Sequence, residues 1–269
     1  MSEAPTPGLA DPIRRFEDAR GELRTRVERA EGLLLCTDFD GTLAPIESDP
    51  EAATITPENR TVLEELRDRE DTRVAIVSGR ALADVRKRVG LSGLAYSGNH
   101  GLELARRGRE AVHPVAAKHR ARIQRICREL AAELAEIEGT VVENKSVTAT
   151  IHYRNTPEDA VPRVREAIER IRSAIGDGRI RKTGGKEIIE LRPAVRWHKG
   201  MAVSLLAEDY DDWLPVYIGD DTTDESAFRA VGDGLAIYVG EGHTAAHYRI
   251  PHQREVAPSL RAIAAWRSD

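Results

Sequence analysis

The sequence predicts an α/β protein whose core is a doubly wound parallel sheet and which carries an inserted α+β domain. Over most of the chain, short apolar runs bounded by polar turns alternate with helical patterns. Runs that are continuously apolar are typical of parallel strands, which are buried on both faces. The stretch from about Glu103 to Pro193 departs from this rhythm, because it has two longer amphipathic helices and strands that alternate apolar and polar residues.

The N-terminal segment predicts one helix before the first strand. Residues 1–10 are rich in Pro and Ala, so we expect them to fray. Asp11 and Pro12 then suit the N-cap and the first helical position, and an apolar stripe that includes Leu23 and Val27 follows. Gly32 is expected to end this helix.

Five apolar runs predict the strands of the core. They are Leu33–Thr37, Arg73–Val77, Leu94–Tyr96, Val216–Ile218 and Leu235–Val239. Helical patterns lie between most of them, for example Pro57–Arg69 and Met201–Glu208. Short links between strands and helices favour βαβ units and hence a parallel sheet.

The inserted stretch predicts one sheet with a face covered by two helices. The first helix carries Ile123, Ile126, Leu130, Leu134 and Ile137, and the second carries Val161, Val164, Ile168, Ile171 and Ile175. Thr156-Pro157 is expected to cap the second helix. The runs Val147–Tyr153 and Glu187–Leu191 alternate as half-exposed strands do.

Composition and charge exclude several classes of protein. Of the 269 residues 41% are hydrophobic, and the net charge of −5 gives no general attraction to nucleic acid or anionic lipid. The basic segment Lys118–Arg128 lacks interleaved aromatic residues, so we interpret it as a solvated helix face. Cys36 and Cys127 form no disulfide framework or zinc motif. With no signal-peptide pattern and no long apolar run, a cytoplasmic protein that binds no membrane is expected.

The strongest motif is Asp38-Phe39-Asp40-Gly41-Thr42, directly after the strand Leu33–Thr37. Open α/β sheets bind ligands at the carboxyl ends of their strands. Two carboxylates this close repel each other unless a cation lies between them, which suggests a metal. One carboxylate can then attack phosphorus while the other handles a proton.

A second acidic group, Gly219-Asp220-Asp221-Thr222-Thr223-Asp224, follows the strand Val216–Ile218. Magnesium prefers hard oxygen ligands, and two strand-end acid groups brought together supply them. Asp220 follows its strand as Asp38 does, so it is the stronger candidate ligand. Asp224 has the alternative of capping the next helix.

Two further segments suit a phosphate. Ser78-Gly79-Arg80 follows the strand Arg73–Val77 and opens a helix, where a hydroxyl and free backbone N–H groups hold an anion. Lys199 begins the helix after the insertion and offers a point charge. Alone, the tripeptide is usually a helix cap and a lysine is usually solvated.

Together these four motifs resemble those of the haloacid dehalogenase superfamily, and the insertion resembles its C2-type cap. The match is closest to the trehalose-6-phosphate phosphatases. The similar segments include Gly98-Asn99-His100-Gly101, Val142-Glu143-Asn144-Lys145, His152-Tyr153-Arg154 and Gly185-Lys186-Glu187-Ile188-Ile189-Glu190, with Thr244–Arg249 and Glu255-Val256 near the end. The resemblance covers about residues 33–265.

The resemblance implies a Rossmann-like core of residues 1–102 and 196–269 and a cap of residues 103–195. It implies a Mg²⁺-dependent phosphatase of trehalose biosynthesis that forms an aspartyl-phosphate. Asp38 is then the nucleophile, Asp40 the acid and base, and Ser78 and Lys199 bind the phosphoryl oxygens. Mg²⁺ is held by Asp38, Asp40 (through its carbonyl) and Asp220, with help from Asp221 and Asp224. The expected substrate-binding residues are Arg80, Asn99, His100, Glu143, Lys145, Lys186 and Glu190.

Alternatives stay open for several of these residues and for the function. Glu143 and Lys145 also suit an exposed strand face, Lys186 and Glu190 a helical ion pair, and His100 a turn cap. His152 and Arg154 favour a structural role. Other functions are a phosphatase of a sucrose, mannosyl or glucosyl phosphate, a phosphomutase, and an inactive domain that regulates a synthase. Functional coupling to a trehalose-6-phosphate synthase is left open.

Overall fold

The structure is a computed structural model that describes residues 13–47, 49, 51–185 and 187–267. It divides into two compact units, which are described separately. The first unit contains Met1–Arg73 and Ala207–Asp269, and the second contains Val74–Leu206.

The strands of the first unit pair in the order β1-β13-β12-β11-β2, and every pair is parallel. Their bounds are β1 Arg14–Arg15, β2 Leu33–Thr37, β11 Leu214–Gly219, β12 Leu235–Val239 and β13 Tyr248–Ile250. Every residue of β2 is buried, in agreement with its unbroken apolar run. The predicted α/β class with a sheet dominated by parallel pairs is confirmed.

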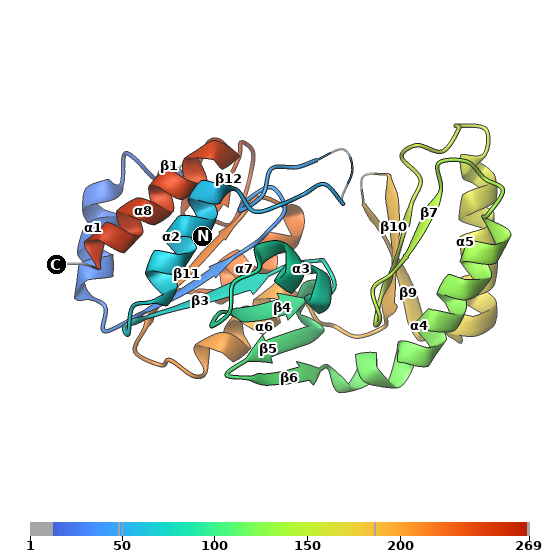
Figure 1. The fold of residues 1–269 in the computed structure, drawn as a ribbon, viewed down its shortest axis with the longest axis horizontal. Coiled ribbons are helices and arrows are strands. Elements are labelled where there is room, and N and C mark those ends of the chain that lie inside the picture. Colours follow the sequence, from blue (N-terminus) through green and yellow to red (C-terminus); the bar gives the residue numbers. More distant parts are fainter. Residues whose placement is uncertain (1–12, 48, 50, 186, 268–269) are drawn as a thin grey trace, which may run out of the picture. The chain divides into compact units, whose positions relative to one another are not determined.

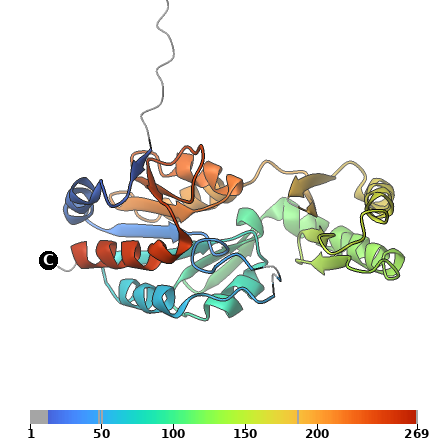
Figure 2. The same cartoon turned by 90° about the horizontal axis from the view of Figure 1, so that it is seen from above.

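The α-helices of this unit, among the described residues, are α1 Arg20–Arg29, α2 Pro57–Arg67, α7 Glu225–Ala230 and α8 Val256–Trp266. Helix α8 contacts both α1 and α2 (Figure 2). The Thr56 side chain caps α2 and Pro57 is its first residue. The predicted start of the first helix was wrong, because Arg14–Arg15 pair with β13 and α1 begins only at Arg20. Asp11 and Pro12 lie outside the described residues.

The second unit begins within β3 (Thr72–Val77), which pairs in parallel with β4 (Ala95–Gly98). Antiparallel strands β5 (Glu103–Arg106) and β6 (Arg109–Val112) follow β4, and neither was predicted. Helices α3 (Leu82–Val89) and α6 (Lys199–Ala207) complete this part.

The rest of the second unit is a four-stranded antiparallel sheet in the order β7-β8-β10-β9. Its strands are β7 Val141–Asn144, β8 Ala149–His152, β9 Ile180–Gly185 and β10 Ile188–Pro193. Helices α4 (Pro114–Glu133) and α5 (Val161–Gly176) cover one face of this sheet (Figure 1). The cap predicted for the second helix was wrong, because α5 starts after Ala160 rather than at Thr156-Pro157.

Apolar side chains of both helices and of the sheet form one core, which contains nearly all the predicted stripe residues. The basic side chains between Lys118 and Arg128 lie on the exposed or half-exposed side of α4. Among the described residues, no helix combines the length and the apolar character that crossing a membrane requires. The predicted boundaries at residues 103 and 195 stay predictions.

Candidate active site

Three carboxylates meet at the carboxyl ends of β2 and β11. The two strands pair in parallel with Thr37 opposite Ile218, so Asp38 and Asp220 follow neighbouring strands at the same edge. One oxygen each from Asp38, Asp220 and Asp224 lies within 4.8 Å of the others. Asp38 and Asp224 are buried, and Asp220 is half-buried. Such a set of hard oxygen donors fits a divalent cation.

Asp224 is held by protein donors. Its Oδ1 accepts a 2.5 Å hydrogen bond from the Tyr217 hydroxyl, and its Oδ2 accepts from the backbone N–H groups of Asp220 and Asp221. Burial, followed by the negative charges of Asp224 and Asp38, raises the pKa of Tyr217 well above its usual value. Tyr217 therefore stays a hydroxyl donor, and Asp224 fixes the loop that carries Asp220.

The other two predicted metal ligands lie differently. The Asp221 side chain is exposed and accepts from the backbone N–H of Thr222, where it caps a short 3-10 turn. Asp40 is half-buried and, like Asp221, is outside the cluster of three carboxylates. The Thr42 hydroxyl donates to Asp220 Oδ1 at 3.1 Å, an orienting contact that the sequence analysis missed.

The glycines of both motifs make room for these carboxylates. A Cβ on Gly41 would lie 2.0 Å from Asp220 Oδ2, and Gly41 has φ of +75°. A Cβ on Gly219 would lie 2.5 Å from the carboxyl carbon of Asp224. Neither position accepts a side chain without moving an acid of the cluster.

In the second unit, Ser78 ends up buried between β3 and α3. Its hydroxyl oxygen accepts from the Arg80 backbone N–H at 3.1 Å, so it is not a cap of α3, whose N-cap is Ala81. The Arg80 guanidinium donates to Asp84 at 3.0 Å. The Ser78 turn is therefore closed by its own hydrogen bond, and the Ser78 hydroxyl is buried.

Asn99 and His100 follow β4 with φ of +49° and +55°. Backbone N–H groups of Asn99 and His100 donate to Arg80 O at 2.7 Å and Ser78 O at 3.0 Å. The His100 ring packs on Gly79, where a Cβ would lie 2.5 Å from the ring. This left-handed turn therefore backs the Ser78 loop.

Lys199 is the first residue of α6 and only 2% exposed, which is rare for a lysine. Its charge contributes to lowering the pKa of His100, after burial and before the charges of Arg192 and Lys145. The predicted phosphate ligand is thus a buried cation that acts on His100, not a solvated one.

Polar side chains occupy the face of the four-stranded sheet opposite α4 and α5. Glu143, Thr150, Glu190 and Thr183 are register neighbours across its four strands. Glu143 accepts from His152 Nε2 at 2.9 Å and lies 3.7 Å from Lys145 Nζ. Burial raises the pKa of Glu143, but the hydrogen bond from His152 and the charge of Lys145 outweigh it, so the net shift is downward.

Glu190 lies near several donors, and its Oε2 accepts from the Thr183 hydroxyl at 3.4 Å. His100 Nε2 lies 3.6 Å from its Oε1, and Arg192 Nη1 lies 4.0 Å from its Oε2. Among the described residues, Glu190 Oε1, His100 Nδ1 and Arg192 Nε are buried and have no hydrogen-bond partner. Buried polar atoms of this kind call for a ligand or water.

Lys186 lies outside the described residues. Tyr217, His152 and Arg192 support the carboxylates and were not predicted for the site. Alternation along Val147–Tyr153 placed His152 on the polar face, which was the available signal; Tyr217 sits inside an apolar strand and gave none.

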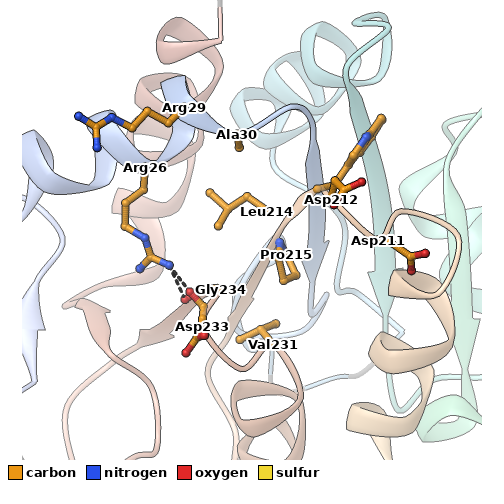
Figure 3. A pocket seen from close by; sticks show the side chains of 11 residues that line it. Arg26, Arg29, Ala30, Asp211, Asp212, Leu214, Pro215, Val231, Asp233 and Gly234 are labelled. Carbon is orange, nitrogen blue, oxygen red and sulfur yellow. Dashed lines mark hydrogen bonds between the residues drawn. The ribbon is translucent and has the colours of Figure 1, made fainter.

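The cavity of about 500 Å³ that Figure 3 shows lies in the first unit, and none of the three clustered carboxylates lines it. Leu214 and Pro215, at the start of β11, line it, whereas Asp220 follows the end of that strand. Arg26 reaches the backbone oxygens of Asp233 and Gly234 there. The cavity therefore opens at the opposite end of β11 from the carboxylates.

Replacing His100 is expected to flatten the dependence of stability on pH. The folded-state pKa of His100 lies well below 6.5, so below that pH the unfolded chain binds a proton that the folded one excludes. The stability of the wild-type protein should fall as the pH drops through 6.5, and that of His100→Asn should fall less. Asparagine is chosen because it tolerates the positive φ of this position. Thermal unfolding between pH 8 and pH 5 measures this. His198→Asn, at an exposed position, is the control, and parallel curves for all three proteins would contradict the prediction.

Comparison with known proteins shows to which family the chain belongs. The trehalose-phosphatase family model matches residues 36–254. The chain belongs to the trehalose-phosphatase family. This is a family of phosphatases, and the four motifs of the site lie inside the matched range.

Individual relatives agree with this membership. A trehalose-phosphate phosphatase of Mycobacterium marinum is 40% identical over 232 residues, which is 82% of this chain and 58% of that protein. The chain thus spans little more than half the length of this trehalose-phosphatase relative. A solved trehalose-6-phosphate phosphatase related protein has a TM-score of 0.77 at 27% identity, covering 86% of this chain and 97% of that one. A haloacid dehalogenase-like hydrolase from Bacteroides thetaiotaomicron shares the fold (TM-score 0.61, 16% identity, 86% and 99% covered).

Proposed function

We propose that the protein hydrolyses trehalose 6-phosphate to trehalose and phosphate. The observation that carries the proposal is the carboxylate cluster of Asp38, Asp220 and Asp224 at the carboxyl ends of two parallel strands in a chain of this family. Family membership supports a sugar phosphate as substrate, and the relatives' names supply trehalose 6-phosphate.

The proposed reaction has two steps that share Asp38 and Asp40. In the first, an Asp38 carboxylate oxygen attacks phosphorus, the bond from phosphorus to sugar O6 breaks, and Asp40 gives a proton to O6. In the second, Asp40 takes a proton from water, whose oxygen attacks phosphorus and releases phosphate from Asp38. The buried position of Asp38 and its Oδ1 bond from the Phe39 N–H at 2.7 Å support a fixed nucleophile.

The donor set fits a divalent cation, and we propose Mg²⁺. Asp38, Asp220 and the Asp40 carbonyl would hold it, with Asp221 and Asp224 in support. Since Asp224 already accepts three hydrogen bonds, its proposed part is to orient the Asp220 loop. When bound, Mg²⁺ offsets the negative charge of the carboxylates and of the phosphoryl group.

Ser78 and Lys199 are the proposed phosphoryl ligands, and Arg80 adds a cation beside Ser78. His100, Glu143, Lys145, Lys186 and Glu190 are the proposed sugar contacts. The unpaired buried atoms of His100, Glu190 and Arg192 support a ligand rich in hydroxyl groups, which can donate to one and accept from another. Cytoplasmic location and coupling to a synthase stay predictions.

A phosphate-release assay tests the substrate and the metal together. Trehalose 6-phosphate is expected to be turned over at least about tenfold more efficiently than glucose 6-phosphate or sucrose 6-phosphate, because unfilled buried polar groups penalise the wrong sugar. EDTA should abolish release and added Mg²⁺ should restore it. Equal or higher efficiency on another sugar phosphate would reassign the substrate, and release that persists in EDTA would contradict the metal.

A further inference from the structure

The Asn99 side chain is enclosed within the second unit. Its Nδ2 donates to Glu103 Oε2 at 2.6 Å and to the backbone oxygen of Lys145 at 2.9 Å. Its Oδ1 accepts from the Thr148 hydroxyl at 2.6 Å. Asn99 and Thr148 are 0% exposed and Glu103 is 7% exposed. Both amide hydrogens of Asn99 are used by acceptors, which also fixes the orientation of the amide.

These bonds join three segments that are distant in the sequence. Glu103 Oε2 also accepts from the backbone N–H of Leu82 at 2.9 Å, the first residue of α3. Because Ala81 gives α3 no side-chain cap, Glu103 satisfies one of the N–H groups that a helix start leaves open. The Asn99 amide therefore links the start of α3, next to the Ser78 loop, to the turn that carries Lys145.

The backbone of Asn99 is in a conformation that needs support. Its φ of +49° is followed by φ of +55° at His100, and consecutive left-handed residues other than glycine are costly. Strain of this kind persists where the surroundings over-determine it, and it clusters at functional sites. The buried hydrogen bonds of the Asn99 side chain hold the residue in this conformation.

We infer that Asn99, Glu103 and Thr148 form a buried polar clasp that fixes the Lys145 turn to the start of α3. The inference rests on the proposed function only for the role of Lys145 as a sugar contact. The clasp makes Asn99 a positioning residue in place of the predicted sugar contact, because the hydrogen-bonding groups of its amide are already bonded to Glu103, Lys145 and Thr148. Lys145 Nζ donates to the backbone oxygen of Gly79, next to Ser78, at 3.4 Å.

The backbone conformation of the Lys145 turn also depends on the clasp. In its turn the Lys145 N–H donates to Thr148 O at 3.0 Å, and the Val147 N–H donates to Lys145 O at 2.8 Å. The Lys145 carbonyl is thus shared by Val147 and Asn99. Loss of the clasp would free the turn while leaving the Lys145 side chain chemically intact.

The first test measures hydrogen exchange and needs no substrate. Thr148→Val removes the hydroxyl and keeps the shape, and Thr148→Ser keeps the hydroxyl. Amides of Lys145, Val147 and Leu82 should exchange about tenfold faster in Thr148→Val and at the wild-type rate in Thr148→Ser. The control is Thr156→Val, which removes a hydroxyl that pairs with Thr140 in the same unit. Unchanged exchange in Thr148→Val, or the same acceleration in Thr156→Val, would overturn the clasp.

The second test connects the clasp with Lys145. In the wild-type background, Thr148→Val should lower kcat/KM for trehalose 6-phosphate about tenfold. In a Lys145→Ala background the same change should cost less than about threefold, since the residue it positions is gone. If the wild-type protein hydrolyses trehalose 6-phosphate and Thr148→Val lowers kcat/KM by the same factor in both backgrounds, the positioning role is refuted. If the wild-type protein does not hydrolyse it, the proposed function fails and the exchange result still decides the clasp.

Discussion

An Asp38→Asn variant is expected to fold normally and to lose at least about a thousandfold in turnover, because a carboxamide is a poor nucleophile. The change is nearly isosteric. The amide oxygen can still accept from the Phe39 N–H, and the Asp38 backbone N–H keeps its 2.8 Å bond to Ile218 O. The change removes the negative charge of the carboxylate and puts an amide nitrogen in place of its second oxygen.

Phosphate release from trehalose 6-phosphate, with thermal unfolding as the check on folding, measures this effect. Asp68→Asn is the matched control, because it removes one carboxylate charge from an exposed position at the end of α2 in the same unit. Activity of Asp38→Asn within tenfold of the wild type would rule out covalent catalysis by Asp38. An equal loss in Asp68→Asn would trace the effect to net charge.

The parallel core strands were predictable because burial on both faces leaves an unbroken apolar run. Leu33–Thr37 and Leu235–Val239 were predicted to the residue. The short strands β1 and β13 were missed, because β1 has only the two residues Arg14–Arg15 and β13 only three residues. A polar pair with no alternation carries no strand signal.

Helix starts were less predictable than helix faces. The apolar stripe from Val164 to Ile175 was predicted, since it packs in the core between the helix and the sheet. The cap was not, because the Thr156 hydroxyl pairs with Thr140 rather than with a helix N–H. A capping side chain has competing local partners that the sequence does not rank. The same limit applies to Ser78, which accepts from Arg80 ahead of the helix.

For the site, the rule that ligands bind at the carboxyl ends of parallel strands was enough to predict that Asp38 and Asp220 lie together. What the sequence could not supply is how side chains share donors. Asn99 looks like a sugar ligand by its motif, yet its amide is used by Glu103 and Lys145. Tyr217 reads as a core residue of β11, and only its 2.5 Å bond reveals that it holds Asp224.

Gly41→Ala is expected to reduce turnover about a hundredfold and to raise the Mg²⁺ concentration needed for activity. The added Cβ would lie 2.0 Å from Asp220 Oδ2, far inside ordinary contact distance, so the carboxylate must move by more than about 1 Å. Displacements of about 1 Å in a reacting site typically cost about a hundredfold in rate. Asp220 cannot withdraw freely, because Thr42 holds its other oxygen at 3.1 Å.

The positive φ of Gly41 adds a separate penalty of about 1–2 kcal/mol in stability, which any alanine in that conformation pays. Gly232→Ala isolates that penalty, because Gly232 has φ of +54° in the same unit and a Cβ there meets nothing within 4 Å. Rates measured over a range of Mg²⁺ concentrations should then separate the two variants. Both lose stability, but only Gly41→Ala should need more Mg²⁺, since only there does the new methyl group displace a carboxylate of the cluster. If Gly41→Ala kept the wild-type Mg²⁺ dependence, Asp220 would not be a metal ligand.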